Sequence, residues 1–421
     1  MEYEKLRKKY PRFVYESYFY NLSKNNLEIF FNFKIEPDIF FTPQIVFENV
    51  KKEQINRLAK EELNNLIFNL GLIEIPSYWK ATCSPLIEIK AGFLNKIQIK
   101  WWKNLILKGM GQFFYENKIN FTKKDFLQIK VSNFLKENFL YQGDLKDRFL
   151  VPVGGGKDSI VTIEKLKKEK KEIACFLVNP TKEMLDVVKM AKIKDKIIVK
   201  RKIDKKLLEL NKKGFLNGHT PITAVISFLG VLAGILFDFK NLVFSNEKSS
   251  DEGNVKYLGK IINHQWSKSS EFEKMFSKYC QKYLAKKLNY FSLLRKYSSL
   301  EIIQEFIKYP QYFYVFSSCN VKKAKKLKRK WCGNCPKCLF LFALLYPFLD
   351  KKKLIKIFGE DLFEKKELLE TMKSLILPKK TKPFECVGTK KENFLIFKLA
   401  LKKAKERSEK LPFLLRYFEN I

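Results

Sequence analysis

The chain has 421 residues, of which 46% are hydrophobic, so it is long enough for two or three domains and too apolar to be disordered. Its net charge of +37 comes mostly from lysine spread along the whole chain. Nucleic-acid-binding proteins usually concentrate such charge and read bases with arginine, so a nucleic acid is not the expected partner. The same charge would attract a small, phosphate-bearing molecule.

Two features of the chain bear on its location. The first residues are polar where a signal peptide would need an apolar core. The most apolar run, residues 221–237, is interrupted by Thr, Ser and Gly and barely reaches membrane-spanning length. We therefore expect a cytoplasmic protein without a membrane span, whose eight cysteines are largely reduced.

The first third of the chain predicts an antiparallel β-meander followed by helices. Aromatic-rich, partly alternating segments at 13–22, 27–35 and 39–47 are separated by turn residues and predict three strands. Helical periodicity follows over 51–70 and 94–115, and the latter contains a pair of tryptophans that we expect to pack in a core or a domain interface. No residue of this region indicates chemistry.

From Arg148 the pattern changes to alternating strands and helices. The predicted strands are 149–153, 173–178, 196–199 and 242–244, and the predicted helices are 160–166, 179–191 and 221–237. This alternation implies a parallel, doubly wound sheet, in which ligands bind beyond the carboxyl ends of the strands. Asn179 follows the second strand and Asn246 the fourth, so we expect both to face a bound cofactor.

A glycine-rich loop, Gly154-Gly155-Gly156-Lys157-Asp158-Ser159, follows the first of these strands and leads into a helix. Glycines let backbone N–H groups approach a ligand closely, and a helix N-terminus favours a phosphate. Lys157 adds a positive charge, Asp158 can hold a divalent metal ion, and Ser159 can donate to a phosphate oxygen. The alternative is a glycine turn that is capped by Asp158 or Ser159.

The spacing of this loop fits neither a Walker loop nor a dinucleotide-binding turn. It resembles the pyrophosphate loop of the N-type ATP pyrophosphatases, Ser-Gly-Gly-x-Asp-Ser, with Gly154 in the place of the serine. The resemblance implies that ATP, with Mg²⁺, is cleaved between its α and β phosphates. Enzymes with this loop typically activate a carboxylate or an amide as an adenylate and release diphosphate.

Four cysteines form a Cys-x12-Cys-x2-Cys-x2-Cys pattern, and they are Cys319, Cys332, Cys335 and Cys338. Thiolates at this spacing can surround one metal ion, so we expect a tetrahedral, structural Zn²⁺ site. Buried free thiols and an iron–sulfur cluster are the alternatives.

The chain has only two histidines, His219 at the start of a predicted helix and His264 in a polar segment. Lone histidines are usually structural. Because polar residues surround these two, we weigh a role in a site and a structural role equally for each. A third candidate is Cys386, in the loop 382–388 between helical segments, for which the alternative is a buried cysteine in a turn.

Seven segments resemble, in chain order, the UDP-N-acetylmuramoyl-L-alanyl-L-glutamate epimerases of bacterial peptidoglycan synthesis. They are 154–159, 216–221, 245–249, 252–254, 263–269, 316–320 and 382–388. The resemblance implies an ATP-dependent inversion of the terminal L-Glu of UDP-MurNAc-L-Ala-L-Glu, which yields AMP, diphosphate and the D-Glu product. A pyrophosphate-loop enzyme that modifies tRNA or forms amides is the alternative.

Inversion at this carbon requires activation, because a neighbouring carboxylate makes the Cα–H a very weak acid. An adenylate would delocalise the carbanion as an enolate, and two groups on opposite faces would then transfer protons. We predict His264 and Cys386 as these groups, with Lys268 placed one helical turn from His264 to counter the charge. Glu247 and Glu385 are further candidates for catalysis, if burial raises the pKa of either carboxyl. The residues expected to bind the substrate are His219, Asn263, Gln265 and Ser267.

The expected fold is therefore α/β, with a parallel doubly wound sheet of the pyrophosphate-loop type. We expect an antiparallel β and helical region over 1–145, an ATP-binding domain over 146–310, and a four-cysteine site with a helical carboxyl-terminal region over 311–421.

Overall fold

The computed structural model describes residues 2–132, 139–321, 330–408 and 410–421. The strands are β1 (Arg12–Ser23), β2 (Asn26–Ile35), β3 (Ile39–Phe41), β4 (Gln44–Glu48), β5 (Leu86–Ile89), β6 (Gln128–Val131), β7 (Phe149–Pro152), β8 (Ile173–Val178), β9 (Lys196–Lys202), β10 (Asn241–Phe244), β11 (Val255–Tyr257), β12 (Lys260–Ile262) and β13 (Asn289–Ser292). The helices are α1 (Tyr3–Lys9), α2 (Lys52–Ile55), α3 (Lys60–Trp79), α4 (Lys96–Gly109), α5 (Gly111–Glu116), α6 (Lys157–Lys168), α7 (Lys182–Ala191), α8 (Lys205–Lys212), α9 (Ile222–Leu236), α10 (Ser270–Tyr283), α11 (Ser299–Phe306), α13 (Pro336–Leu345), α14 (Lys351–Phe358), α15 (Leu369–Ile376), α16 (Lys390–Glu406) and α17 (Phe413–Glu419).

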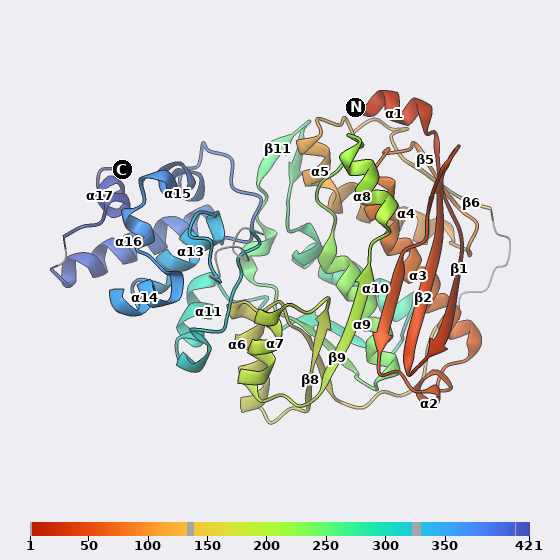
Figure 1. Ribbon diagram of the computed structural model, residues 1–421, viewed down its shortest axis with the longest axis horizontal. Helices are drawn as coiled ribbons and strands as arrows, with labels where there is room; N and C mark the ends of the chain where they lie inside the picture. Colours follow the sequence, from red (N-terminus) through yellow and green to blue (C-terminus); the bar gives the residue numbers. More distant parts are fainter. Residues whose placement is uncertain (1, 133–138, 322–329, 409) are drawn as a thin grey trace.

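One sheet runs through the first two thirds of the chain, in the order β13-β10-β7-β8-β9-β4-β2-β1-β5-β6, and β3 pairs with β2 (Figure 1). The strands from β13 to β9 are parallel, as predicted, and β13 was not foreseen. β4 pairs antiparallel with β9, with Phe47 opposite Val199, so the predicted meander continues the parallel sheet. The predicted strand 39–47 is two strands, because Thr42 and Pro43 interrupt it and proline has no N–H for the ladder.

Helices cover both faces of the parallel part of the sheet. Because side chains alternate along a strand, Leu150 and Leu242 lie in a core with α3, α9 and α10, whereas Val151 and Val243 lie in a second core with α6, α11 and α13. Helix α9 approaches β10 closely, since a Cβ on Gly230 would lie 2.7 Å from the Leu242 side chain. The expected mixed α/β class with helices on both faces is confirmed.

The carboxyl-terminal helices α13 to α17 form a helical region at one end of the molecule (Figure 1). Aromatic side chains hold them together, with Phe342 and Phe363 at a ring-centroid distance of 5.0 Å and Phe363 and Phe397 at 5.7 Å. The predicted helical, cysteine-rich carboxyl-terminal part is thereby confirmed.

The predicted amino-terminal helices are present but divided. The segment 51–70 contains α2 and the start of α3, and the segment 94–115 is broken at Met110 between α4 and α5. Trp102 is buried and donates a hydrogen bond of 3.0 Å to the Tyr279 hydroxyl, and Trp101 stacks on the same ring. The two tryptophans therefore pack in the core. Within the described ranges, no helix is both long enough and apolar enough to cross a membrane.

Candidate active site

The site lies where the order of the parallel strands reverses. β7 has β8 on one side and β10 on the other, so the loops after β7 and β10 leave the sheet in opposite directions and open a crevice at their carboxyl ends. A cavity of about 520 Å³ occupies this place. The predicted site residues that line it are Gly154, Gly156, Lys157, Asp158, Ser159, His219, Asn246, Glu247, His264, Gln265, Ser267, Lys268 and Cys386.

The glycine loop forms the floor of the cavity at the start of α6. Gly155 has a φ of +81°, a conformation that L side chains rarely adopt, and a Cβ on Gly156 would lie 2.4 Å from the Ser318 hydroxyl. Among the described residues, no atom lies within 4 Å of a Cβ built on Gly154. The N-terminus of a twelve-residue helix therefore opens directly into the cavity.

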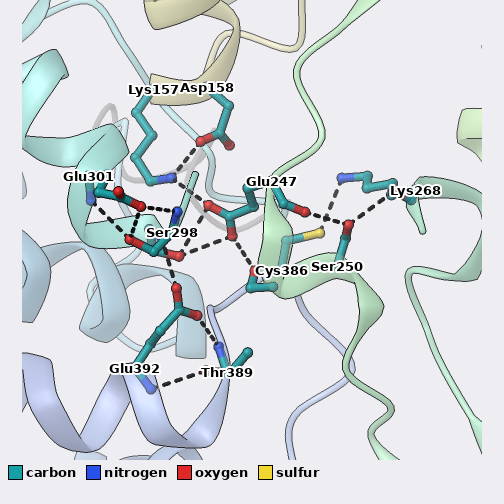
Figure 2. Close-up of polar contacts among 12 residues, drawn as sticks. Lys157, Asp158, Glu247, Ser250, Lys268, Ser298, Glu301, Cys386, Thr389 and Glu392 are labelled. Atoms are coloured by element: carbon teal, nitrogen blue, oxygen red, sulfur yellow. Dashed lines mark hydrogen bonds and ion pairs between the residues drawn. The ribbon is translucent and has the colours of Figure 1, made fainter. Parts of the chain in front are cut away.

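Lys157 links this loop to the end of β10. Its buried ammonium lies 2.5 Å from an oxygen of Asp158 and 3.3 Å from an oxygen of Glu247 (Figure 2). Burial disfavours its charge, but the attraction of the two carboxylates raises the pKa of Lys157 above its ordinary value. Lys157 is therefore a fixed positive charge at the floor of the cavity.

Lys157 is not the only donor that holds the Glu247 carboxylate. The hydroxyls of Ser249 and Ser299 donate to its carboxylate at 2.5 and 3.1 Å. Burial would raise the pKa of Glu247, yet Lys157 and these hydroxyls lower it. This carboxylate stays charged, a state that suits it to holding Lys157 and not to releasing a proton near neutral pH.

Lys268 and Cys386 meet on the opposite side of the cavity. The Lys268 ammonium donates to the Cys386 sulfur at 3.2 Å, and Figure 2 shows the two side chains pointing toward each other from separate segments. Attraction to the sulfur raises the pKa of Lys268 despite its burial.

The two histidines are neighbours, with ring centroids 4.7 Å apart. Burial and the positive charge of Lys268 lower the pKa of His264 to about 4. Burial and His264 lower the pKa of His219 to about 3. Both rings are therefore neutral at pH 7. His264 and Lys268 were expected on one α-helical turn, but they lie on a turn and a short 3-10 helix, Trp266–Lys268.

Apart from the four predicted metal-binding cysteines, four predicted site residues do not line the cavity. The side-chain amide of Asn179 donates a hydrogen bond of 2.9 Å to the Arg201 carbonyl in β9 and accepts one of 2.8 Å from the Arg201 N–H. The side-chain amide of Asn263 likewise donates to the Ser250 carbonyl and accepts from the Gln265 N–H. Glu385 lies 3.6 Å from the Lys337 ammonium, and Gly155 accepts a backbone hydrogen bond from Ser317.

Several residues of the site were missed from the sequence. Ser318, Asn320 and Lys337 line the cavity, and Lys337 stands between two of the predicted metal ligands, a position that could have indicated it. Gln112 of α5 contacts the His264 ring at 2.5 Å. No signal in the sequence marks Gln112, which lies in the first third of the chain, where no residue indicated chemistry.

The four predicted metal-binding cysteines come together beside α13. Their sulfurs lie within 4.8 Å of one another, with separations of 4.0, 3.7 and 3.4 Å for Cys319–Cys335, Cys332–Cys338 and Cys335–Cys338. Four sulfurs at about 2.3 Å from a tetrahedral Zn²⁺ would be about 3.8 Å apart. The cluster therefore has the size and the ligand set for a metal ion of this kind.

These features define an α/β enzyme with a polar crevice between a glycine loop and a Lys–Cys contact. A family model described as the MurL N-terminal domain matches residues 4–293, and one described as the MurL C-terminal domain matches residues 315–417. The chain belongs to this family, the UDP-N-acetyl-alpha-D-muramoyl-L-alanyl-L-glutamate epimerases, as its motifs indicated, and it is therefore an isomerase.

Three curated relatives carry that epimerase name. The protein from Xanthomonas oryzae pv. oryzae (strain MAFF 311018) is 34% identical over 327 residues, which cover 77% of this chain and 72% of the relative. The protein from Micromonospora sp. (strain ATCC 39149 / NRRL 15099 / SCC 1413) is 31% identical over 80% of this chain and 75% of its own length. The protein from Salinispora tropica (strain ATCC BAA-916 / DSM 44818 / JCM 13857 / NBRC 105044 / CNB-440) is 37% identical over 60% of this chain and 55% of its own length.

Proposed function

We propose that this enzyme inverts the terminal L-Glu of UDP-MurNAc-L-Ala-L-Glu through an acyl-adenylate, at the expense of ATP. The observation that carries the proposal is that the Lys157–Asp158 loop and the Lys268–Cys386 contact face the same cavity. The loop suits the binding of a phosphate chain. The Lys268–Cys386 contact suits a proton transfer, because the ammonium balances the negative charge left on the sulfur. The names of the curated relatives supply the substrate.

The glycine loop is assigned to the phosphates. The N-terminal N–H groups of α6 and the Lys157 ammonium would bind them, Asp158 would hold Mg²⁺, and Asn246 would hold Mg²⁺ or a phosphate oxygen. The α-carboxylate of the substrate attacks the α phosphorus, and diphosphate leaves. The product of this step is a mixed anhydride, whose carbonyl can accept the electrons of the neighbouring C–H bond.

His264 and Cys386 are assigned to the proton transfers. The neutral His264 ring takes the Cα proton of the L-Glu adenylate, and the Cys386 thiol gives a proton to the opposite face of the enolate. The Lys268 ammonium, 3.2 Å from the sulfur, stabilises the negative charge that the sulfur then carries. Water hydrolyses the anhydride to AMP and the D-Glu product, and proton exchange with solvent restores both groups.

The remaining predicted residues are assigned to binding and structure. His219, Gln265 and Ser267 line the cavity and would contact the substrate, whereas Asn263 shapes the turn that presents them. Glu385 is the next candidate for proton transfer, whereas Glu247, whose pKa is lowered and not raised as its candidacy required, holds Lys157. The cluster of four cysteines would hold a structural Zn²⁺ that fixes the start of α13 and the segment 317–320.

The test of this function is AMP formation by the purified enzyme with ATP and Mg²⁺. The UDP-linked L-Ala-L-Glu should stimulate AMP release, and the D-Glu diastereomer should appear in amounts that match turnover. RNA-stimulated AMP release without any response to the dipeptide would instead identify a tRNA-modifying enzyme.

A further inference from the structure

The His264 ring has one polar contact with a residue far away in the chain. Its Nδ1 lies 2.5 Å from Oε1 of Gln112, in α5 of the amino-terminal third. α5 can come this near because a Cβ on Gly111 would lie 3.3 Å from Ile262, at the end of β12 and two residues before His264.

The orientation of the Gln112 amide follows from its second contact. Its Nε2 lies 2.8 Å from an oxygen of Glu116, one turn further along α5. A carboxylate can only accept a hydrogen bond, so the NH₂ group of the amide must face Glu116 and the carbonyl oxygen must face His264. The opposite orientation would place two acceptors against each other at the Glu116 side of the amide.

This orientation decides which ring nitrogen of His264 carries the proton. Oε1 of Gln112 has no hydrogen to offer, so Nδ1 of the neutral ring must be the donor. The proton is then absent from Nε2, and no other described residue makes a hydrogen bond to that atom. Nε2 is left as the basic nitrogen of a ring that lines the cavity.

We propose that Gln112, itself oriented by Glu116, is a positioning residue that fixes His264 as the Nδ1–H tautomer and thereby makes Nε2 the proton acceptor. The inference rests on the proposed function, in which His264 removes the Cα proton. When Nε2 takes that proton, the Nδ1–H bond to Gln112 is kept, so the ring charges without turning. The amino-terminal third thus contributes to the site.

The backbone of His264 is fixed by a separate contact. Asn254 accepts a hydrogen bond of 2.8 Å from the His264 N–H and donates one of 2.7 Å to the Pro383 carbonyl, in the loop that carries Cys386. Asn254 therefore sets where His264 stands relative to the Cys386 loop, and Gln112 sets which nitrogen is basic. The charged and titratable groups around the ring are Lys268, Lys337, Glu385, Glu116 and His219.

The experiment is a two-bond ¹H–¹⁵N correlation spectrum of the full chain labelled with [¹⁵N]histidine, at pH 7.5 and without ligands. The chain has only two histidines, so His264→Asn and His219→Asn variants assign both rings. For His264 we expect the unprotonated nitrogen to correlate with both ring C–H protons, as Nε2 does. An unprotonated nitrogen that correlates with Hε1 alone, or a doubly protonated ring, would overturn the proposal.

Two variants separate positioning from folding. Gln112→Leu should mix the tautomers and lower kcat by roughly tenfold or more, with KM changed little. Gln112→Glu should keep Nδ1 protonated and move the acidic limb of the kcat profile to higher pH, because a carboxylate stabilises the imidazolium. The control Gln128→Leu, on the exposed side of β6, should leave spectrum and kcat unchanged.

Failure of the inference and failure of the proposed function give different results. The spectrum needs neither ATP nor substrate, so a wrong tautomer rejects the Gln112 assignment whatever the enzyme does. The expected tautomer together with wild-type inversion by Gln112→Leu would reject the catalytic role of this contact alone, whereas His264 as the base is tested separately by His264→Asn.

Discussion

The ammonium nitrogen of Lys268 lies 3.2 Å from the sulfur of Cys386, although the two residues are 118 positions apart in the chain. Replacement by Lys268→Met should slow alkylation of Cys386 by iodoacetamide roughly tenfold, which corresponds to about 1.4 kcal/mol of lost attraction for the reactive thiolate. Mass spectrometry of the alkylated, metal-loaded protein at pH 7.5 measures this rate.

The other thiols provide an internal reference for this labelling. Burial raises the pKa of Cys83, Cys175 and Cys280 to about 12, so they should stay unlabelled in the folded protein. The control Lys256→Met, at an exposed position of β11, should label as the wild type does. Equal alkylation rates in Lys268→Met and the wild type would show that the contact does not activate the sulfur.

Asp158→Asn should abolish diphosphate release, with a loss of roughly a hundredfold or more in kcat, because the amide cannot neutralise a metal ion as the carboxylate does. The change keeps the side-chain volume, so the circular dichroism spectrum should be that of the wild type. Asp125→Asn, at an exposed site, is the matched control. Wild-type ATP turnover in Asp158→Asn would reject the assignment of this loop.

The native protein should contain one zinc per chain, and Cys338→Ser should lose it together with several degrees of thermal stability, since metal binding is coupled to folding. Elemental analysis and thermal unfolding check both. In Cys280→Ala, a core thiol away from the cluster, the metal content should stay at one. A metal-free native protein would contradict the proposed metal site, and the presence of iron would indicate an iron–sulfur cluster in place of zinc.

The two half-buried histidines predict how stability depends on pH. The pKa of His264 is lowered to about 4 and that of His219 to about 3, against about 6.5 in an unfolded chain. As the pH falls, the unfolded chain takes up protons first, so this contribution is complete above pH 6.5 and is lost as the pH falls toward 4. For His264 the shift corresponds to about 3 kcal/mol.

Urea unfolding midpoints between pH 7 and pH 4.5 measure this effect. The double variant His219→Asn/His264→Asn should show a shallower loss of stability with acid than the wild type. Identical slopes in the two proteins would mean that these rings are not buried as neutral groups.

The features of this site that could be predicted from the sequence are those that short segments of the chain determine by themselves. The glycine loop, the spacing of the four cysteines and the alternation of strands and helices are determined within short segments, and the structure places all of them as expected. The contact between Lys268 and Cys386 joins distant segments. Each residue was a candidate in its own segment, but no local pattern indicated that the two side chains touch.

The features that were missed depend on tertiary contacts. β13 is short, with two aromatic residues between polar ones, and it is a strand because β10 offers it an edge, with Val243 opposite Phe291. Gln112 has no motif around it, and it reaches His264 only because α5 packs against β12. Asn179 follows a strand as predicted, but its side-chain amide makes two hydrogen bonds with the backbone of Arg201 and does not face the cavity.

The most direct test of the central claim follows AMP and Cα deuterium together, in D₂O, with UDP-MurNAc-L-Ala-L-Glu as substrate. The wild type should form AMP only when the dipeptide is present and should place one deuterium at Cα of the D-Glu product. His264→Asn should still release AMP and diphosphate in response to the dipeptide, yet neither invert the glutamate nor exchange its Cα proton. Inversion by the wild type without ATP, or unchanged inversion and exchange in both His264→Asn and Cys386→Ser, would contradict the account.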